Sequence, residues 1–271
     1  MSLGRQLKSL AWHGVKAFSA MAPSPSRRSS VTVFTLHRLI PDACSELEVT
    51  PAQAESWLRS ITARYRVLHG SEFLSPAPDD RPFALITVDD AFSDAHDHLW
   101  PLLQRLQLPV VLFVPTHFID TGEPPVSFAV ERSRYRPCSW EQLRAMAASP
   151  WITLGAHSHA HSEAPTQRTA ELAADTEAAL ARFTAEGLPR PHLYAYPRGK
   201  FTAEAASVLG NYFDAGFAGL PHHSLPGDLA RMAWPRVPLR GSDAGFWGER
   251  KIRNGISHEE YWVERIKGRL K

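Results

Sequence analysis

Two adjacent carboxylates at the end of an apolar segment are the first residues of this sequence that could do chemistry. Phe83 to Val88, FALITV, is mostly apolar and is followed directly by Asp89 and Asp90. Such a run is typical of a strand buried on both faces, as in a parallel sheet covered by helices. Two ionised carboxylates at a buried strand end repel each other and lose hydration, so they need a cation or a shared proton. Taken alone, the stretch fits a solvated turn equally well.

A second apolar segment ends in histidines. Trp151 to Ala156, WITLGA, is followed by His157, His159 and His161, three histidines within five residues. The i, i+4 spacing of His157 and His161 places both rings on one side of a helical turn, and His159 is expected to point away. Imidazole and carboxylate ligands together suit Zn²⁺ or a similar divalent ion. The two segments together therefore predict a metal site.

Four segments together resemble a known family. TVDDAFSD, from Thr87, resembles the TFDDG motif of polysaccharide deacetylases, the NodB-homology domain of carbohydrate esterase family 4, and HSHAH fits the H-S/T-x-x-H motif of that family. YAYPRGKF, Tyr194 to Phe201, is similar to the FAYPYG form of the third motif. FTLHRL, Phe34 to Leu39, is similar to the YHRI segment of the branch that includes poly-N-acetylglucosamine deacetylases. Each motif alone is weakly specific, but all four occur in the family's order and spacing between residues 31 and 240.

The resemblance implies a hydrolytic site built around one divalent ion, with Zn²⁺ as the first candidate. Asp90, His157 and His161 correspond to the metal ligands of the family. Three protein ligands leave one coordination position open, as in catalytic zinc sites. Asp89 corresponds to the general base that accepts a proton from water.

The remaining catalytic assignments involve departures from the family pattern. The backbone N–H of Arg198 follows the third-motif proline and is expected to stabilise the oxyanion, although the family usually has Tyr there. His37 matches the histidine of the YHRI segment, and no LxH motif follows it. We expect His37 to protonate the leaving amine from the side of the rim opposite Asp89, with nearby negative charge favouring its protonated form. Ala195 replaces an arginine directed at the base, a charge that Arg236 or Arg38 could supply.

The elements that must position these residues alternate along the chain. Strand-like and helix-like segments follow each other from Val31 onward, which is typical of parallel strands joined by crossover helices. The candidate residues all follow expected strands, and the carboxyl ends of barrel strands meet at one rim. We therefore expect an α/β fold, a distorted (β/α) barrel of about seven parallel strands, which is also the fold that the resemblance implies.

Local patterns predict several helix starts and one loop. Thr50, Ser139 and Ser257 each precede Gln or Glu by three residues, which is typical of a capping box. Asp94 is expected to cap a further helix. The segment 116–137 has no clear periodicity and is expected to be an irregular loop.

Length and composition fit one large globular domain. The chain has 271 residues, of which 44% are hydrophobic and 21% charged. Its formal net charge of +2 is too small to indicate nucleic acid, and no nucleic-acid partner is expected. Cys44 and Cys138 form no CxxC motif and fit free thiols in a reducing compartment.

The first thirty residues differ from the rest. We expect residues 1–30 to be an N-terminal amphipathic segment and linker, and residues 31–271 to be the polysaccharide deacetylase (NodB-like) domain. Leucines at helical spacing alternate with basic residues, so residues 1–20 could contact a membrane surface, and a docking helix or a frayed tail fits equally well. Neither a signal-peptide core nor a membrane-spanning run is present. We therefore expect a cytoplasmic protein, peripheral at the inner membrane.

The expected function is metal-dependent hydrolytic N-deacetylation of an N-acetylated saccharide, in a surface polysaccharide or its precursor. One alternative is an amidohydrolase-type metalloenzyme with His157 and His159 as an HxH pair, which would leave Asp89 and Asp90 unused. Another is a catalytically inactive carbohydrate-binding module. That reading is compatible with the departures at Val88, Ala91, Ala195 and Arg198, but the intact carboxylates and histidines argue against it.

Overall fold

The computed structural model describes residues 14–15, 31–123, 134–219, 225 and 227–266. The expected N-terminal amphipathic segment and linker therefore lie outside the described residues, apart from positions 14–15. Within the described part of the chain, no helix is both long enough and apolar enough to cross a membrane.

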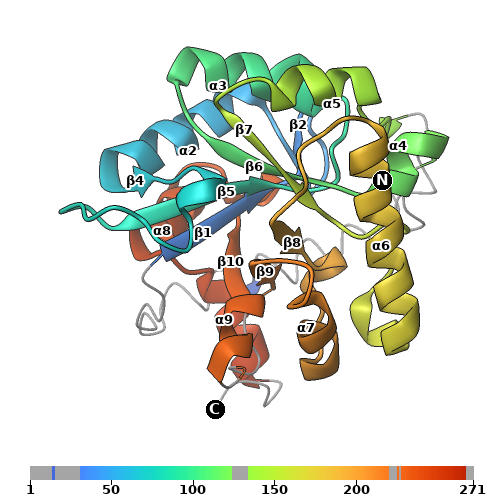
Figure 1. Ribbon diagram of the computed structural model, residues 1–271. Helices are drawn as coiled ribbons and strands as arrows, with labels where there is room; N and C mark the ends of the chain where they lie inside the picture. Colours follow the sequence, from blue (N-terminus) through green and yellow to red (C-terminus); the bar gives the residue numbers. More distant parts are fainter. Residues whose placement is uncertain (1–13, 16–30, 124–133, 220–224, 226, 267–271) are drawn as a thin grey trace.

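Seven parallel strands close into a barrel (Figure 1). Their order around the barrel is β1, β10, β9, β8, β7, β6 and β5, and β5 pairs with β1 to close it. The expected distorted (β/α) barrel is thereby confirmed. The barrel strands are β1 (Val31–Leu36), β5 (Phe83–Val88), β6 (Val110–Val114), β7 (Ile152–Ala156), β8 (Leu193–Ala195), β9 (Ala215–Ala218) and β10 (Trp234–Pro238).

The strand pairs differ in length, and this unevenness distorts the barrel. β1 and β5 pair along their whole length, whereas β7 and β8 meet at Ala156 and Tyr194. β4 (Arg66–Val67) pairs with the start of β5, and β6 pairs with the end of β5. A separate small sheet, β2 (Arg38–Leu39) with β3 (Glu48–Val49), follows β1.

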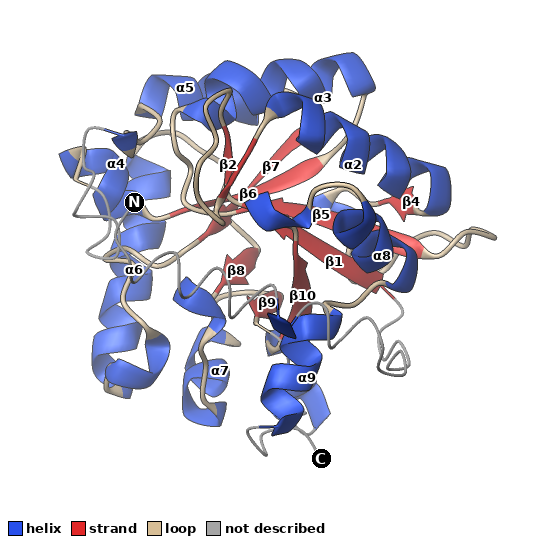
Figure 2. Ribbon diagram, turned by 180° about the vertical axis from the view of Figure 1, so that it is seen from behind, coloured by secondary structure: helices blue, strands red, loops and turns tan. Residues whose placement is uncertain are grey.

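Helices surround the barrel, with α2, α3 and α5 on one side and α6 and α7 on another (Figures 1 and 2). The helices are α2 (Pro51–Arg64), α3 (Trp100–Leu106), α4 (Thr116–Thr121), α5 (Trp140–Ala147), α6 (Thr169–Ala185), α7 (Ala203–Leu209), α8 (Phe246–Asn254) and α9 (His258–Ile266). Short helical turns are η1 (Gly70–Glu72), the π-helical η2 (Ala95–Leu99), η4 (Ala164–Thr166), η5 (Pro197–Gly199), η6 (Gly227–Met232) and η7 (Gly241–Asp243). Because α4 begins at Thr116, the expectation of an irregular loop is wrong at its start.

The expected helix caps are confirmed at two positions and wrong at two. Thr50 and Ser139 each accept a hydrogen bond from the N–H three residues further on, at 3.2 Å and 3.1 Å. The capping box is complete at Ser139, whose N–H donates to Gln142 Oε1, but not at Thr50, because the Gln53 side chain donates to the carbonyl of Gly241 instead. Asp94 makes no cap, because its carboxylate is turned to the segment after β1 instead. Ser257 directly precedes α9, but its hydroxyl has no hydrogen-bond partner among the described residues, so the third capping box does not form.

Alternate residues of the strands face the barrel interior. Val31, Val33 and Leu85 pack together in an interior cluster, which also takes residues from β6, β8 and β9. Phe34 and Ile86, on the other face of the same strands, pack in the large cluster beneath α2, α3 and α5. This is the period of two of a strand, with both faces covered by apolar atoms.

The same alternation places polar residues of the interior face at the rim of the barrel. Residues two apart share a face, so the inward positions of β1, β5 and β7 continue to His37, Asp89 and His157. Below these three residues, apolar side chains fill the barrel interior. A Cβ atom on Gly155 would lie 2.4 Å from Cε1 of Phe113, so only glycine fits at that inward position. Polar side chains can therefore gather only where the strands end.

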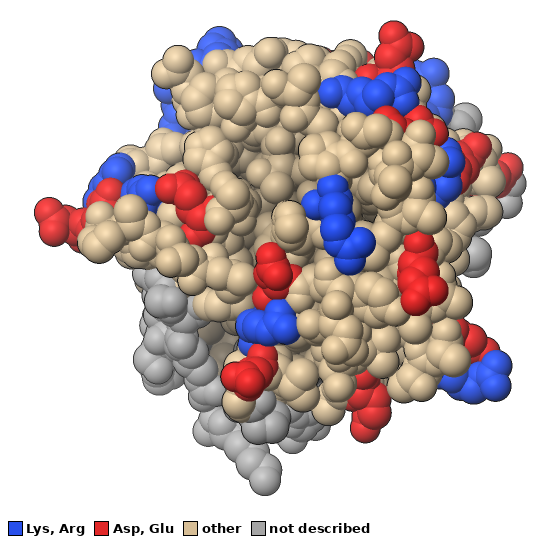
Figure 3. All heavy atoms as spheres, viewed as in Figure 1, with Lys and Arg blue, Asp and Glu red and all other residues tan. Residues whose placement is uncertain are grey.

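Charges of both signs lie close together on the surface. Figure 3 shows acidic side chains next to basic ones on the face seen in Figure 1, without a continuous patch of either sign. Opposite charges also form ion pairs in the described part of the chain, for example Arg144 Nη1 with Glu186 Oε2 at 2.6 Å. Exposed pairs of this kind contribute little to stability, about 0–1 kcal/mol for a typical pair.

Candidate active site

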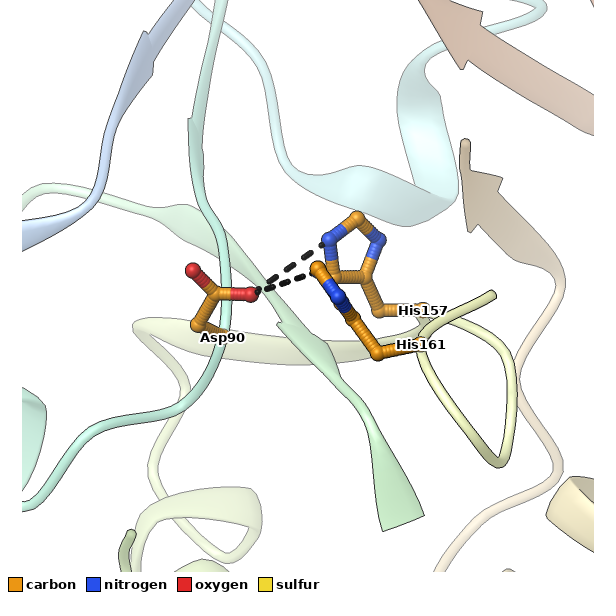
Figure 4. A group of neighbouring side chains, drawn as sticks. All are labelled: Asp90, His157 and His161. Carbon is orange, nitrogen blue, oxygen red and sulfur yellow. Dashed lines mark ion pairs between the residues drawn. The ribbon is translucent and has the colours of Figure 1, made fainter. Parts of the chain in front are cut away.

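Asp90, His157 and His161 converge at the carboxyl ends of β5 and β7 (Figure 4). Asp90 Oδ1 lies 3.6 Å from His157 Nε2 and 3.2 Å from His161 Nε2. One ligand atom from each residue lies within 4.8 Å of the other two, and all three side chains are largely shielded from solvent. The structure thus brings together the three residues that the sequence predicts as metal ligands.

The donor set at this point fits a divalent cation. Asp90 Oδ1 is buried and accepts no well-formed hydrogen bond from the described residues. Burial opposes ionisation of Asp90, but His161, His157 and His37 outweigh it and keep its pKa below the usual range. Burial lowers the pKa of His157 to about 4, so its ring is neutral at neutral pH. An ionised carboxylate with neutral imidazole nitrogens is the combination that Zn²⁺ accepts.

The orientation of His157 is set by a residue of the third motif. Its Nδ1 lies 2.7 Å from the carbonyl oxygen of Ala195. A carbonyl can only accept, so Nδ1 carries the proton and donates it, and Nε2 is left with its lone pair facing Asp90. Such a hydrogen bond fixes both the tautomer and the ring direction of a metal-binding histidine. Ala195 thus contributes through its backbone, although its side chain departs from the family pattern.

Left-handed backbone occurs in three of the four motifs. Non-glycine residues are strained in this conformation, at about 1–3 kcal/mol each, and such strain gathers at functional sites. Apart from Gln107 at the end of α3, every non-glycine residue with positive φ in the described ranges lies in a motif. These residues are Asp90 (φ 73°), Ala91 (φ 46°), Ser158 (φ 64°), His161 (φ 54°) and Arg198 (φ 56°).

Asp89 pairs with Arg236, which supplies the positive charge that Ala195 cannot. Arg236 Nη1 lies 2.7 Å from Asp89 Oδ1, and both side chains are buried. Burial opposes ionisation of Asp89, but Arg236, with smaller contributions from His157 and His37, outweighs it and lowers the pKa of the carboxyl. Asp89 is therefore an ionised carboxylate beside the ligand group but outside it, which is the arrangement a general base requires.

Arg38, the other candidate for that charge, belongs to a separate buried network. Its Nε donates to Asp94 Oδ1 at 2.9 Å and its Nη1 to Glu48 Oε1 at 3.0 Å. Asp94 also accepts the backbone N–H of Leu39 at 2.8 Å. The last residue of TVDDAFSD is thus tied to the segment that carries His37. The sequence shows Asp94 as a carboxylate next to the first motif, but the expected role was a helix cap, not a bond to Arg38 and Leu39.

His37 lies beside Asp89, because β1 is the direct neighbour of β5 in the closed barrel. His37 Nε2 is 3.8 Å from Asp89 Oδ2, and about a quarter of the side chain is exposed. The expectation that His37 faces the site from the opposite side is therefore wrong. Asp89 and Asp90 raise the pKa of His37, as expected, but burial together with Arg236 and Arg240 outweighs them, so the net shift of its pKa is downward.

Arg198 turns its side chain away from the ligand group. Its Nη1 lies 2.9 Å from Glu163 Oε1, and Lys200 Nζ lies 2.7 Å from Glu163 Oε2. The backbone N–H of Arg198 makes none of the turn and loop hydrogen bonds found among the described residues. Its backbone donor is therefore available for a ligand, while its guanidinium is engaged elsewhere.

His159 is not part of the ligand group. Its Nδ1 lies 2.8 Å from the hydroxyl of Thr116, and its ring packs against His117 with 5.3 Å between centroids. The structure therefore does not bring His157 and His159 together as an HxH pair on one ion.

A parallel barrel with a buried Asp–His–His group at the carboxyl ends of its strands defines an α/β-barrel protein with a candidate metal centre. The family model for polysaccharide deacetylase matches residues 77–212, which include the two aspartates, the histidine motif and the third motif. The chain belongs to the polysaccharide deacetylase family, as the motifs predict.

Several solved structures have a similar fold. IcaB from Ammonifex degensii has 19% identity and a TM-score of 0.69, over 85% of this chain and 99% of that chain. BC0361, a polysaccharide deacetylase from Bacillus cereus, has 14% identity and a TM-score of 0.68, over 84% of this chain and 69% of that chain. A de-N-acetylase from Aggregatibacter actinomycetemcomitans has 16% identity and a TM-score of 0.65, over 82% of this chain and 99% of that chain. No curated protein matches this sequence.

Proposed function

We propose that this protein is a metal-dependent N-deacetylase that hydrolyses the acetamido group of an N-acetylated saccharide, in a surface polysaccharide or its precursor. Membership of the polysaccharide deacetylase family supports this class of reaction. One observation carries the proposal: Asp90, His157 and His161 converge in a buried site beside the ionised pair of Asp89 and Arg236.

One divalent ion, Zn²⁺ as the first candidate, would be held by Asp90, His157 and His161. When bound, such an ion polarises a carbonyl oxygen and lowers the pKa of water in its open position. The hydrogen bond from His157 to the carbonyl of Ala195 keeps the Nε2 lone pair directed at this point.

Asp89 accepts the proton of the attacking water. Arg236 keeps the carboxylate ionised and holds one of its oxygens, so that the other oxygen, Oδ2, is directed towards His37 and the site. The acetamide carbon gains the water oxygen and loses the sugar nitrogen, so the products are acetate and a free amine.

Two further groups act on the same substrate. The backbone N–H of Arg198 donates to the oxygen of the acetamide as negative charge develops on it. His37 delivers a proton to the departing nitrogen. Because burial disfavours its charged form, His37 gains that proton within the reaction. Its Nε2 atom lies 3.8 Å from Asp89 Oδ2, so a small approach of the two side chains would let Asp89 pass on the proton that it takes from water.

Metal content and product analysis test the function together. The purified protein, loaded with one equivalent of Zn²⁺, should release acetate and an equal amount of free amine from N-acetylated glucosamine oligosaccharides. Asp90→Ala should neither retain Zn²⁺ nor release acetate, and Arg105→Met, an exposed change on α3, should do both. Tight Zn²⁺ binding without amine release from any N-acetylated saccharide would favour an inactive binding module, and amine release by metal-free protein would contradict the metal dependence.

The cellular place of this activity is a further proposal. We propose a cytoplasmic protein that contacts the inner membrane through residues 1–20 and acts on a precursor of a surface glycan. Fractionation tests this location, since a processed form in the periplasm would contradict it.

A further inference from the structure

A carboxylate on α6 closes the turn that carries two of the three proposed metal ligands. Asp175 Oδ2 accepts a hydrogen bond from the backbone N–H of His159 at 2.8 Å, and Asp175 Oδ1 accepts one from Ala160 at 2.9 Å. Both carboxylate oxygens are thus bound by consecutive backbone groups that lie between His157 and His161. Hydrogen bonds to an ionised acceptor are the stronger kind.

This turn needs support because its backbone is left-handed at two non-glycine residues. Ser158 has φ 64° and His161 has φ 54°. Strained conformations of this kind persist only where the surroundings hold them. A left-handed residue also turns successive N–H groups to one side, which creates a concave site for an anion. In this protein the anion is the side chain of Asp175.

Other contacts hold different atoms of the same turn. Thr116 donates its backbone N–H to the carbonyl of Ser158 at 3.4 Å, and His117 donates to the carbonyl of His159 at 3.0 Å. These bonds, from the start of α4, hold carbonyl groups and leave the two N–H groups to Asp175. Removal of the Asp175 carboxylate therefore leaves two adjacent donors without their acceptors.

We propose that Asp175 is a positioning residue for the metal centre. It holds residues 158–161 in the conformation that directs His161 Nε2 and His157 Nε2 towards Asp90. His161 depends on the turn most, because the hydrogen bond to the Ala195 carbonyl restrains the His157 ring independently. The inference rests on the proposed metal-dependent function.

Glu177 provides a matched control on the same helix. Its carboxylate accepts a hydrogen bond from the hydroxyl of Tyr212 at 2.8 Å, away from the histidine turn. Glu177→Ala therefore removes an α6 carboxylate and an external hydrogen bond without touching the metal ligands or their backbone.

The test compares Asp175→Ala, Asp175→Asn and Glu177→Ala by two measurements. The first is the Kd for Zn²⁺, from competition with a chromogenic chelator. The second is amide hydrogen exchange of residues 157–163 in metal-free protein. Both Asp175 variants should bind Zn²⁺ about 10–100-fold more weakly and exchange faster in this turn, whereas Glu177→Ala should match the wild type. Asp175→Glu, which keeps the charge, should recover part of the affinity.

Each possible result separates this proposal from the function it rests on. If both Asp175 variants keep the wild-type Kd and the wild-type exchange in the turn, Asp175 has no positioning role. Faster exchange throughout the chain, instead of in the turn alone, would also overturn the proposal, because it indicates a general loss of stability. If Asp175→Ala does not fold, the isosteric Asp175→Asn decides. If the wild type binds no Zn²⁺, the metal-dependent function fails, and exchange in the metal-free turn still shows whether Asp175 holds it.

Discussion

Arg236 on β10 places its Nη1 atom 2.7 Å from Oδ1 of Asp89 at the end of β5. β1 lies between these two strands in the barrel, and the guanidinium passes over it, 3.3 Å from the hydroxyl of Thr35. The pair therefore spans three neighbouring strands at the rim, directly beside the proposed metal ligands. This geometry makes Arg236 the main electrostatic partner of the proposed base.

Arg236→Met should move the acid limb of the kcat/KM–pH profile to higher pH and lower the stability at neutral pH. The guanidinium depresses the pKa of Asp89, so without it the carboxylate is protonated at a higher pH. A carboxyl whose pKa is lowered by folding stabilises the protein at pH values above its unfolded pKa of about 3.9. This contribution is lost as the pH falls through the folded pKa. Leaving a buried charge without its partner costs about 3–5 kcal/mol.

Urea denaturation at neutral pH and a pH–rate profile measure these two effects. Arg105→Met serves as the control, because Arg105 pairs with Glu55 on the exposed surface and should leave both quantities unchanged. An acid limb that stays in place in Arg236→Met would show that a group other than Asp89 controls it.

Asp90→Ala and His157→Ala should each abolish Zn²⁺ binding and activity, whereas His159→Ala should keep the metal. Asp90→Ala and His157→Ala each remove a proposed metal ligand. His159 is not a ligand, because it is hydrogen-bonded to Thr116. Metal analysis after gel filtration provides the measurement. The ligand assignment is wrong if His159→Ala loses the metal while His161→Ala retains it.

Asp89→Asn should retain Zn²⁺ and lose about 10²–10⁴-fold in kcat, because the ligands remain while the base is gone. It also leaves the buried guanidinium of Arg236 without an ionised partner, so the variant should be less stable than the wild type. The double variant with Arg236→Met should recover part of that stability without recovering kcat. A near-normal kcat in Asp89→Asn would assign the base to another group.

His37→Ala should slow hydrolysis of an N-acetyl amide much more than hydrolysis of an activated acetate ester. The amine needs a proton in order to leave, and the activated alcohol does not. Zn²⁺ content and the unfolding midpoint should stay at their wild-type values, since the side chain is partly exposed and makes a 3.8 Å contact to Asp89. Equal losses on both substrates would mean that His37 supports the site structurally and that another group is the acid.

Local patterns were enough to predict much of the site. The apolar run before Asp89 and Asp90, and the spacing of His157 and His161, mark strand ends whose residues meet at one rim. The capping of Thr50 and Ser139 was also predictable, because donor and acceptor lie three residues apart. For the caps, donor and acceptor lie within one turn, so the order of residue types carries the information. The helical turn expected for His157 and His161 does not form, because Ser158 and His161 are left-handed and contacts from α6 and α4 hold that turn instead.

Only the tertiary structure decided which distant residues act on these groups. Arg236, not Arg38, reaches Asp89, and Asp94 bonds to Arg38 instead of capping a helix. His37 lies beside Asp89 because closure of the sheet puts β1 between β5 and β10. Strand neighbours in a closed barrel are set by the packing of the whole sheet and its helices, and no local window of sequence contains that order.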